Sequence, residues 1–202
     1  QNEKTNFEPT SPYAISKLYA HWIINLYREA YGLFCCSGIL FNHESPLRNK
    51  DFIIKKIIVG LLKIIKKKQN IIQIGNIYTR RDWGYAKDYT AIIWKMMQKN
   101  KPKDFIIATG KSYTIKEFID ITAKILKLDV VWYGRGMSEK LIFRKNKKVI
   151  IKINSKYFRP SEIKNSQIDK KNLEKITLVR PKTKFKKLIK LMIEDERKEL
   201  GF

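Results

Sequence analysis

Apolar and polar residues alternate along the chain in blocks that predict short strands separated by amphipathic helices. Residues 52–68 carry apolar pairs at helical spacing with six lysines among them, and apolar residues recur at i, i+3, i+4, i+7 and i+8 from Phe185. Helices are expected over 12–31, 52–68, 87–99, 115–126 and from about Thr183 onward, and strands over 33–41, 71–74, 105–108, 130–133 and 149–153. This alternation of strands and helices is typical of an α/β chain.

Capping residues mark the ends of two predicted helices. Ser11 can cap the first helix, with Pro12 at the first helical position, where a missing N–H costs nothing. Gly32 is a natural left-handed residue to end that helix. Thr114 and Glu117 form a capping box at the start of another helix.

Composition limits the class of protein only broadly. A length of 202 residues with 44% hydrophobic side chains suits one large domain or parts of two. A net charge of +24 is compatible with a polyanion partner. The excess is mainly lysine scattered among isoleucine and asparagine, a pattern that A/T-rich codon bias also produces. No groove-reading or base-stacking module is visible, so a nucleic-acid role is not the favoured interpretation.

The chain shows no sign of a membrane partner. Its N-terminus is polar and no apolar run reaches transmembrane length, so a cytoplasmic location is expected. The lysine-rich helix over 52–68 is interpreted as core-facing rather than as a membrane-surface helix. Cys35 and Cys36 are adjacent, which disfavours a disulfide between them and gives no metal-ligand spacing. The first residue is Gln1, which is compatible with a piece of a longer product.

Tyr13 and Lys17 lie one helical turn apart on the same face of the first predicted helix. A lysine ammonium stabilises a neighbouring phenolate, so the pair could act as a general acid/base on a substrate hydroxyl beside a hydride acceptor. On spacing alone, an ordinary exposed tyrosine and lysine is the better interpretation.

Several longer sequence motifs, which occur in a fixed order along the chain, indicate a family more specifically than this pair of residues. They are SPYA at 11–14, GILFNHESP at 38–46, RDWG at 81–84, AKDY at 86–89, IATG at 107–110 and YFRPSE at 157–162. With them the chain resembles the extended short-chain dehydrogenases/reductases, and among these the GDP-mannose 4,6-dehydratase family. The resemblance implies an α/β fold: the C-terminal part of an NAD(P)-binding Rossmann-type domain with an interleaved small α/β substrate-binding subdomain. Residues 1–50 and 76–103 would form the former, and 51–75 and 104–202 the latter.

The resemblance also implies a reaction. Tyr13 would take the proton of the sugar 4-hydroxyl of GDP-mannose as hydride passes to NADP, with Lys17 beside it on the nicotinamide ribose. The 4-keto group acidifies the C5 proton, so water can then leave across C5 and C6 to give GDP-4-keto-6-deoxymannose, a step toward GDP-fucose. The family's glycine-rich cofactor turn and its active-site Thr and Glu would lie before Gln1, so this chain alone is expected to be incomplete or inactive as a lyase.

Further residues match binding positions of the family. His43 and Arg48 match cofactor-contacting positions. Positions that hold the substrate match Asn42, Lys56, Arg81, Arg159 and Glu162. For Lys56, inside a lysine-rich helix, a solvated surface side chain is a nearly equal interpretation. The complete protein would be a homo-oligomer.

Two functions of other classes stay open. The lysine-rich surface could make the chain a non-catalytic polyanion-binding protein. Family words near the C-terminus are degraded at residues 167–169 and 176–181, which is compatible with a decayed remnant.

Overall fold

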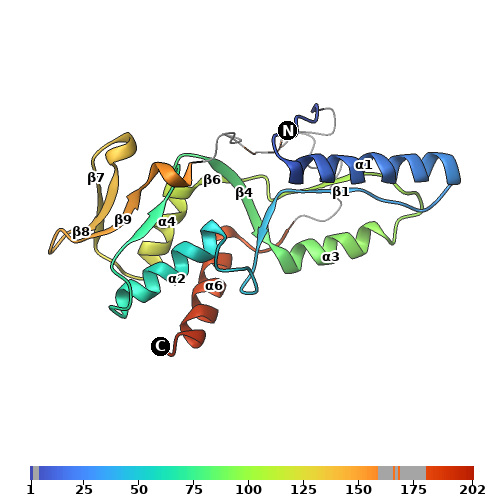
Figure 1. Ribbon diagram of the computed structural model, residues 1–202. Helices are drawn as coiled ribbons and strands as arrows, with labels where there is room; N and C mark the ends of the chain where they lie inside the picture. The colour runs from blue at the N-terminus through green and yellow to red at the C-terminus, as the bar shows by residue number, and fades with distance from the viewer. Residues whose placement is uncertain (2–4, 159–165, 167, 169–180) are drawn as a thin grey trace. The chain divides into compact units, whose positions relative to one another are not determined.

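The computed structural model describes residues 1, 5–158, 166, 168 and 181–202 (Figure 1). The chain divides into two compact units. Unit 1 comprises Gln1–His43, Arg81–Ser112 and Ser161–Thr183, and unit 2 comprises Glu44–Arg80, Tyr113–Pro160 and Lys184–Phe202. Strands β2 (Asn42–Glu44), β4 (Arg80–Tyr85) and β6 (Ser112–Thr114) lie where the chain passes from one unit to the other.

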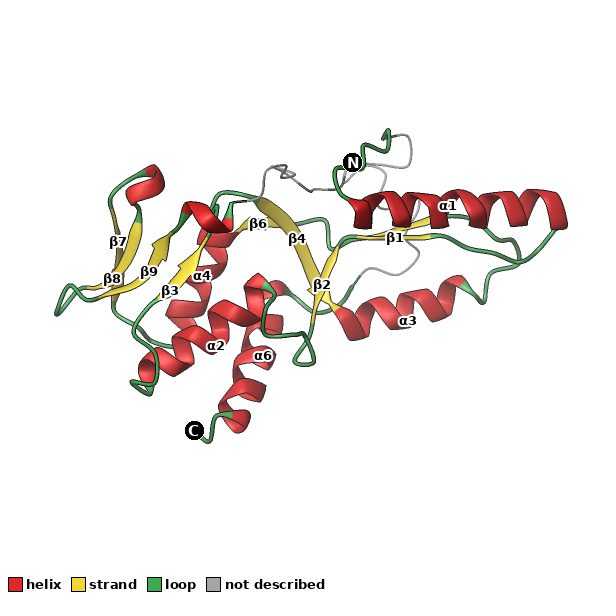
Figure 2. Cartoon of the chain, viewed as in Figure 1, coloured by secondary structure: helices red, strands yellow, loops and turns green. Residues whose placement is uncertain are grey.

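Unit 1 is built on two short parallel strands, β1 (Gly38–Leu40) and β5 (Phe105–Ile107). Helices α1 (Pro12–Tyr31) and α3 (Ala86–Met96) lie on opposite sides of β1 (Figure 2). Apolar residues of α3 and β5 form its buried core, with the half-buried Cys36 packed against them: Tyr89, Ile92, Met96, Phe105 and Ile107. Cys35 and Cys36 are both free thiols.

The strand expected over residues 33–41 is mostly loop, so that prediction was too long. Only three residues pair with β5, and the segment before them is held by side chains instead. Arg28 donates from Nε to the Cys35 carbonyl at 2.7 Å and from Nη2 to Asp104 at 2.5 Å. The backbone N–H of Ser37 donates to the same Asp104 carboxylate at 3.2 Å.

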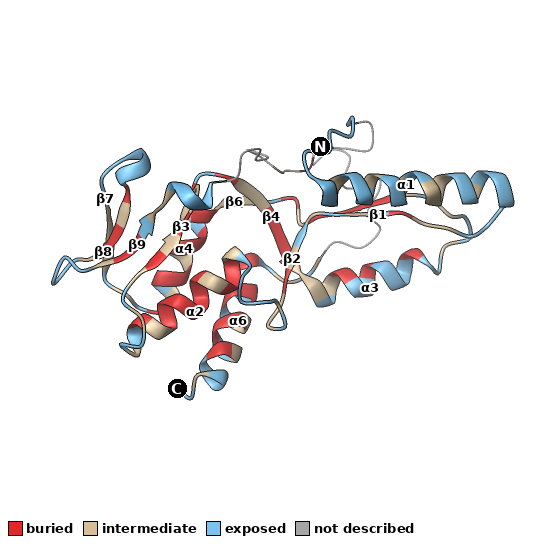
Figure 3. Cartoon of the chain, in the orientation of Figure 1, coloured by how far each residue is buried: buried red, intermediate tan, exposed pale blue. Residues whose placement is uncertain are grey.

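Helix α1 has the predicted bounds and caps. Ser11 Oγ accepts from the Ala14 N–H at 3.1 Å, and Gly32 takes the left-handed conformation at φ +61°. The helix is described along its whole length and has no buried residue. Tyr13, Tyr19 and Trp22 are 72%, 68% and 59% exposed. Much of the surface of α1 is therefore open in this chain (Figure 3).

Unit 2 packs three helices with a four-stranded sheet. The helices are α2 (Ile53–Ile65), α4 (Ile115–Ile125) and α6 (Phe185–Glu199). The strands run in the order β3 (Ile72–Ile74), β9 (Val149–Ile153), β8 (Lys140–Phe143) and β7 (Val130–Tyr133). The pair β3–β9 is parallel, and β8 is antiparallel to both of its neighbours. Two 3-10 turns, η1 (Gly136–Ser138) and η2 (Ser155–Tyr157), follow β7 and β9.

Helix α2 is the central helix of unit 2, and most of its residues are buried. Gly60 allows it to approach β3, because a Cβ at that position would lie 2.6 Å from Ile72 Cδ1. The structure therefore confirms a core helix with a polar edge. None of the helices in the described part of the chain has both the length and the apolar character needed to cross a membrane. The capping box at the start of α4 is also confirmed, with both Thr114 and Glu117 making their reciprocal bonds.

Candidate active and nucleotide-binding site

Tyr13 and Lys17 lie together near the N-terminal end of α1. The Lys17 ammonium is 5.3 Å from the centre of the Tyr13 ring, and both side chains are exposed. The Ser11 cap and Pro12 fix where the helix begins, so the four-residue spacing places both groups on one face. The arrangement places a phenol and an ammonium group side by side on the helix.

Asp82 joins two of the sequence words, RDWG and IATG. Its carboxylate is fully buried and accepts from the Thr109 N–H at 3.1 Å, the Thr109 hydroxyl at 2.7 Å and the Gly110 N–H at 2.8 Å. Burial raises the pKa of Asp82, and these hydrogen bonds counteract it. Asp82 therefore holds the backbone of Thr109 and Gly110 in place. Its neighbour Arg81 is half-buried.

His43 and Tyr89 connect two further words, NHESP and AKDY. Their ring centres are 5.1 Å apart, and His43 Nδ1 lies 3.1 Å from the Phe41 carbonyl. Gly84 makes room for Tyr89, because a Cβ there would meet the Tyr89 ring at 2.3 Å. Burial raises the pKa of the Tyr89 hydroxyl, and that hydroxyl has no hydrogen-bond partner among the described residues.

Glu44 and Arg48 form a partly buried ion pair in unit 2. Arg48 Nε lies 3.3 Å from Glu44 Oε2, and the guanidinium stacks 3.5 Å from the Phe52 ring centre. Glu44 is 3% exposed, and burial raises its pKa from the ordinary value of 4.5 to about 7, although Arg48 opposes the shift. Glu44 was not singled out from the sequence, where nothing distinguishes a buried carboxylate from a loop acid.

The adjacent lysines of α2 have opposite environments. Lys55 is buried, donates to the Pro46 carbonyl and pairs with Glu196 of α6. Lys56 is half-buried, and its ammonium lies 4.3 Å from the centre of the Tyr157 ring in η2. Lys56 is therefore the lysine of this pair that remains accessible to an anion.

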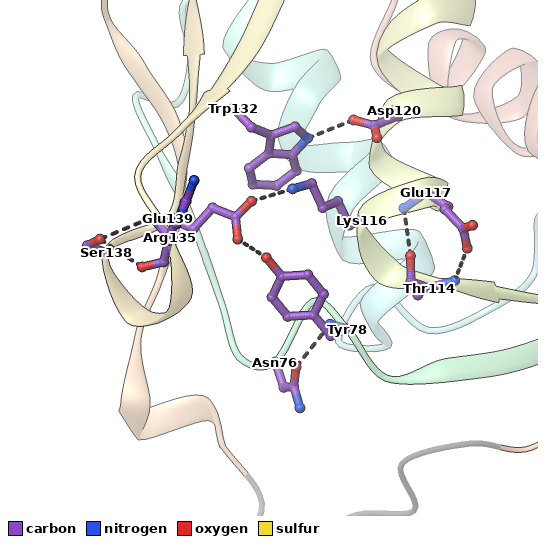
Figure 4. Close-up of polar contacts among 10 residues, drawn as sticks. All are labelled: Asn76, Tyr78, Thr114, Lys116, Glu117, Asp120, Trp132, Arg135, Ser138 and Glu139. Carbon is purple, nitrogen blue, oxygen red and sulfur yellow. Dashed lines mark hydrogen bonds and ion pairs between the residues drawn. The ribbon is translucent and has the colours of Figure 1, made fainter.

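A polar cluster around Glu139 also escaped sequence analysis (Figure 4). Glu139 accepts from the Tyr78 hydroxyl and from the Lys116 ammonium. Burial raises the pKa of Glu139, but the bonds from Lys116 and Tyr78 outweigh burial and leave that pKa lowered. Trp132 donates to Asp120 at 2.7 Å, and Lys116 lies 4.9 Å from the Trp132 ring centre. These partners are too far apart in sequence for any local pattern to connect them.

Of the remaining predicted site residues, one lies within the described part of the chain and two lie outside it. Asn42 is exposed at the start of β2. Arg159 and Glu162 lie outside the described residues. Within the described part of the chain, no group of three or more His, Cys, Asp or Glu side chains is arranged to hold a metal ion.

The fold is shared with nucleotide-sugar epimerases and dehydratases of known structure. The UDP-N-acetylglucosamine 4-epimerase of Methanobrevibacter ruminantium matches with a TM-score of 0.77 and 23% identity, over 98% of this chain and 57% of that one. The dTDP-glucose 4,6-dehydratase of Bacillus anthracis, solved with NAD, matches with a TM-score of 0.76 and 16% identity, over 100% of this chain and 57% of that one. The predicted α/β, Rossmann-type fold is confirmed.

Sequence similarity identifies the family within this fold. The model of the GDP-mannose 4,6 dehydratase family matches residues 1–192. The GDP-mannose 4,6 dehydratase of Drosophila melanogaster is 40% identical over 194 residues, which cover 96% of this chain and 49% of that protein. The chain therefore belongs to the GDP-mannose 4,6-dehydratase family, as the sequence words indicated. It spans about half the length of the curated relatives it matches.

The raised pKa of Glu44 predicts a pH-dependent stability. The folded state holds the proton that the unfolded state releases between pH 4.5 and about 7, so Glu44 lowers the unfolding free energy as pH rises through that window. The loss should be on the order of 3 kcal/mol. In urea unfolding at pH 5, 6 and 7, Glu44→Gln should flatten this dependence. Asp51→Asn, at an exposed acid of the following loop, should leave it intact. Equal slopes for Glu44→Gln and the unaltered chain would contradict the assignment.

The Lys55–Glu196 pair predicts a strongly non-additive mutant cycle. Lys55→Met leaves the buried Glu196 carboxylate without its cation, which should cost about 3–5 kcal/mol of unfolding free energy. Adding Glu196→Met should recover most of that loss, because the uncompensated charge is then gone. Lys56→Met serves as the control and should cost less than about 1 kcal/mol. If the double variant is no more stable than Lys55→Met, Lys55 does not stabilise the fold by compensating the charge of Glu196.

Proposed function

We propose that the chain is the catalytic-helix and nucleotide-sugar-binding part of a GDP-mannose 4,6-dehydratase, a lyase that converts GDP-mannose to GDP-4-keto-6-deoxymannose. The observation that carries the proposal is the Tyr13–Lys17 pair, which α1 presents on one exposed face in a chain of this family. Because the chain spans about half of its relatives, turnover is proposed for the complete enzyme.

Tyr13 is the proposed acid/base. Its phenolate oxygen accepts the proton of the sugar 4-hydroxyl, and the Lys17 ammonium stabilises the phenolate by Coulomb attraction. A bound nicotinamide dinucleotide supplies the hydride acceptor for this oxidation.

NADP is the proposed dinucleotide, and the residues present fit such a group. Lys17 has an exposed ammonium suited to a ribose hydroxyl. With His43 Nδ1 donating to the Phe41 carbonyl, Nε2 keeps a lone pair that can accept from the cofactor. Arg48 pairs with Glu44 through its Nε atom, so its terminal N–H groups can donate to a phosphate of the cofactor.

GDP-mannose is the proposed substrate. Lys56 is proposed to hold the diphosphate, supported by its place on the outward side of α2 beside Tyr157. Asn42 and Arg81 are proposed as further substrate contacts, as are Arg159 and Glu162, which lie outside the described residues. The free thiols of Cys35 and Cys36 support a proposed cytoplasmic location. A homo-oligomer is proposed for the complete protein.

Binding of GDP by the 202-residue chain tests the substrate site directly. In calorimetric titration at physiological salt, we expect saturable binding that Lys56→Gln weakens about tenfold or more, because a charge-assisted contact is lost. Lys63→Gln removes the same charge elsewhere on α2 and should leave the affinity unchanged. If a folded chain binds GDP equally well with and without Lys56, the role proposed for Lys56 is wrong.

The catalytic role of Tyr13 is tested in the complete enzyme, with the rest of the family fold supplied. Tyr13→Phe should lower the turnover of GDP-mannose by about 10²–10⁴-fold, because the proton acceptor is removed while the ring remains. Tyr19→Phe, at another exposed tyrosine of α1, is the matched control and should retain turnover. Turnover that survives Tyr13→Phe would exclude Tyr13 as the acid/base.

A further inference from the structure

The sheet of unit 2 has two faces that its register defines residue by residue. One row of mutual partners crosses all four strands as Ile72, Ile151, Leu141 and Trp132. The next row along the strands crosses them as Gln73, Lys152, Lys140 and Tyr133. Since successive residues of a strand point to opposite faces, the two rows lie on opposite faces of the sheet.

The first row faces the helices. Ile72, Ile151 and Leu141 are at most 1% exposed, and Trp132 donates to Asp120 of α4. A bulge at Leu141/Ile142 interrupts the regular alternation, and Ile150 is fully buried beside Ile151. This face is closed by the core of unit 2.

The second row, which we term the outer row (Gln73, Lys152, Lys140 and Tyr133), faces away from that core. Tyr133 is 64% exposed, Lys152 is exposed, and Lys140 and Gln73 are half-buried. The Lys140 ammonium lies 5.4 Å from the Tyr133 ring centre. With neighbouring strands about 4.8 Å apart, the row is ~14 Å long. It therefore combines two cations and an accessible aromatic ring.

The surrounding segment is strongly basic. Residues 127–158 contain nine Lys or Arg and two Asp or Glu. Both acids have partners, since Asp129 lies 3.1 Å from Arg144 and Glu139 is buried against Lys116 and Tyr78. The β8–β9 turn of this segment carries four further exposed cations: Arg144, Lys145, Lys147 and Lys148. These two carboxylates offset few of the nine cations, so the segment keeps a net positive charge.

We propose that the outer row is a binding surface for single-stranded nucleic acid. Lysines neutralise phosphates, and an exposed ring stacks an unpaired base, the combination that single-strand binding requires. A duplex keeps its bases stacked internally and leaves Tyr133 without that role. A membrane surface is less well matched, because insertion needs apolar side chains and this row has no aliphatic residue. This surface is independent of the proposed dehydratase function.

The test is fluorescence anisotropy of a labelled 20-nucleotide oligothymidylate with the 202-residue chain, from 50 to 300 mM NaCl. For single strands, each neutralised phosphate contributes about −0.7 to the slope of log Kobs against log salt. The Lys140→Gln/Lys152→Gln pair should therefore make the slope shallower by about 1.4. Lys186→Gln/Lys190→Gln removes two exposed lysines of α6 and should leave the slope unchanged.

Stacking is tested separately from charge. Tyr133→Ala should weaken binding about fivefold or more, whereas Tyr19→Ala, at an exposed tyrosine of α1, should not. Circular dichroism of each variant checks that the fold is retained.

The proposal is overturned by an unchanged slope of log Kobs against log salt in the Lys140/Lys152 variant. It is also overturned if a duplex of equal length, or vesicles rich in phosphatidylserine, bind as tightly as the single strand. GDP titration of the Lys140/Lys152 variant should match the unaltered chain, so failure here leaves the dehydratase proposal standing.

Discussion

The buried carboxylate of Asp82 is the interaction on which unit 1 depends. A carboxyl group removed from water is tolerated only where hydrogen-bond donors replace its hydration, and here the backbone N–H groups of Thr109 and Gly110 and the Thr109 hydroxyl do so. The loop after β5 is thereby fastened to β4. Gly84, two residues beyond Asp82, leaves the space that the Tyr89 ring occupies, and His43 packs against that ring. Sequence words far apart in the chain thus form one set of contacts.

Charge is used in unit 2 in two distinct ways. Lys55 is buried, and its ammonium pairs with the buried Glu196 carboxylate and donates to the Pro46 backbone carbonyl. Lys56, one residue further along α2, faces out toward Tyr157. A helix turns by about 100° per residue, so neighbouring lysines of one basic run can have opposite functions, one structural and one available to a ligand. The net charge of the chain says nothing about this division.

The proposed dehydratase function and the proposed outer-row surface draw on different properties of the same chain. The first proposal rests on the family resemblance of Tyr13, Lys17, His43 and Lys56. The second rests on strand register, which places Lys140, Lys152 and Tyr133 on the face of the sheet that the helices do not cover. A basic composition that codon bias alone can produce becomes a specific surface only when the fold collects some of its lysines away from acids.

Short-range patterns were readable from the sequence alone. The bounds and caps of α1, the capping box of α4 and the amphipathic helices depend on residues within a few positions of one another, and each is found in the structure. The family motifs are equally local, and the match to the family model confirms the family that they indicated. The strand predicted over 33–41 was too long because apolar character does not reveal how many residues find a partner. The burial of Glu44, the choice between Lys55 and Lys56, the Tyr78–Lys116–Glu139 cluster and the outer row were decided by tertiary structure. Each depends on groups distant in sequence meeting across helices or strands, and the free energy of a buried charge is set by those partners rather than by its neighbours in the chain.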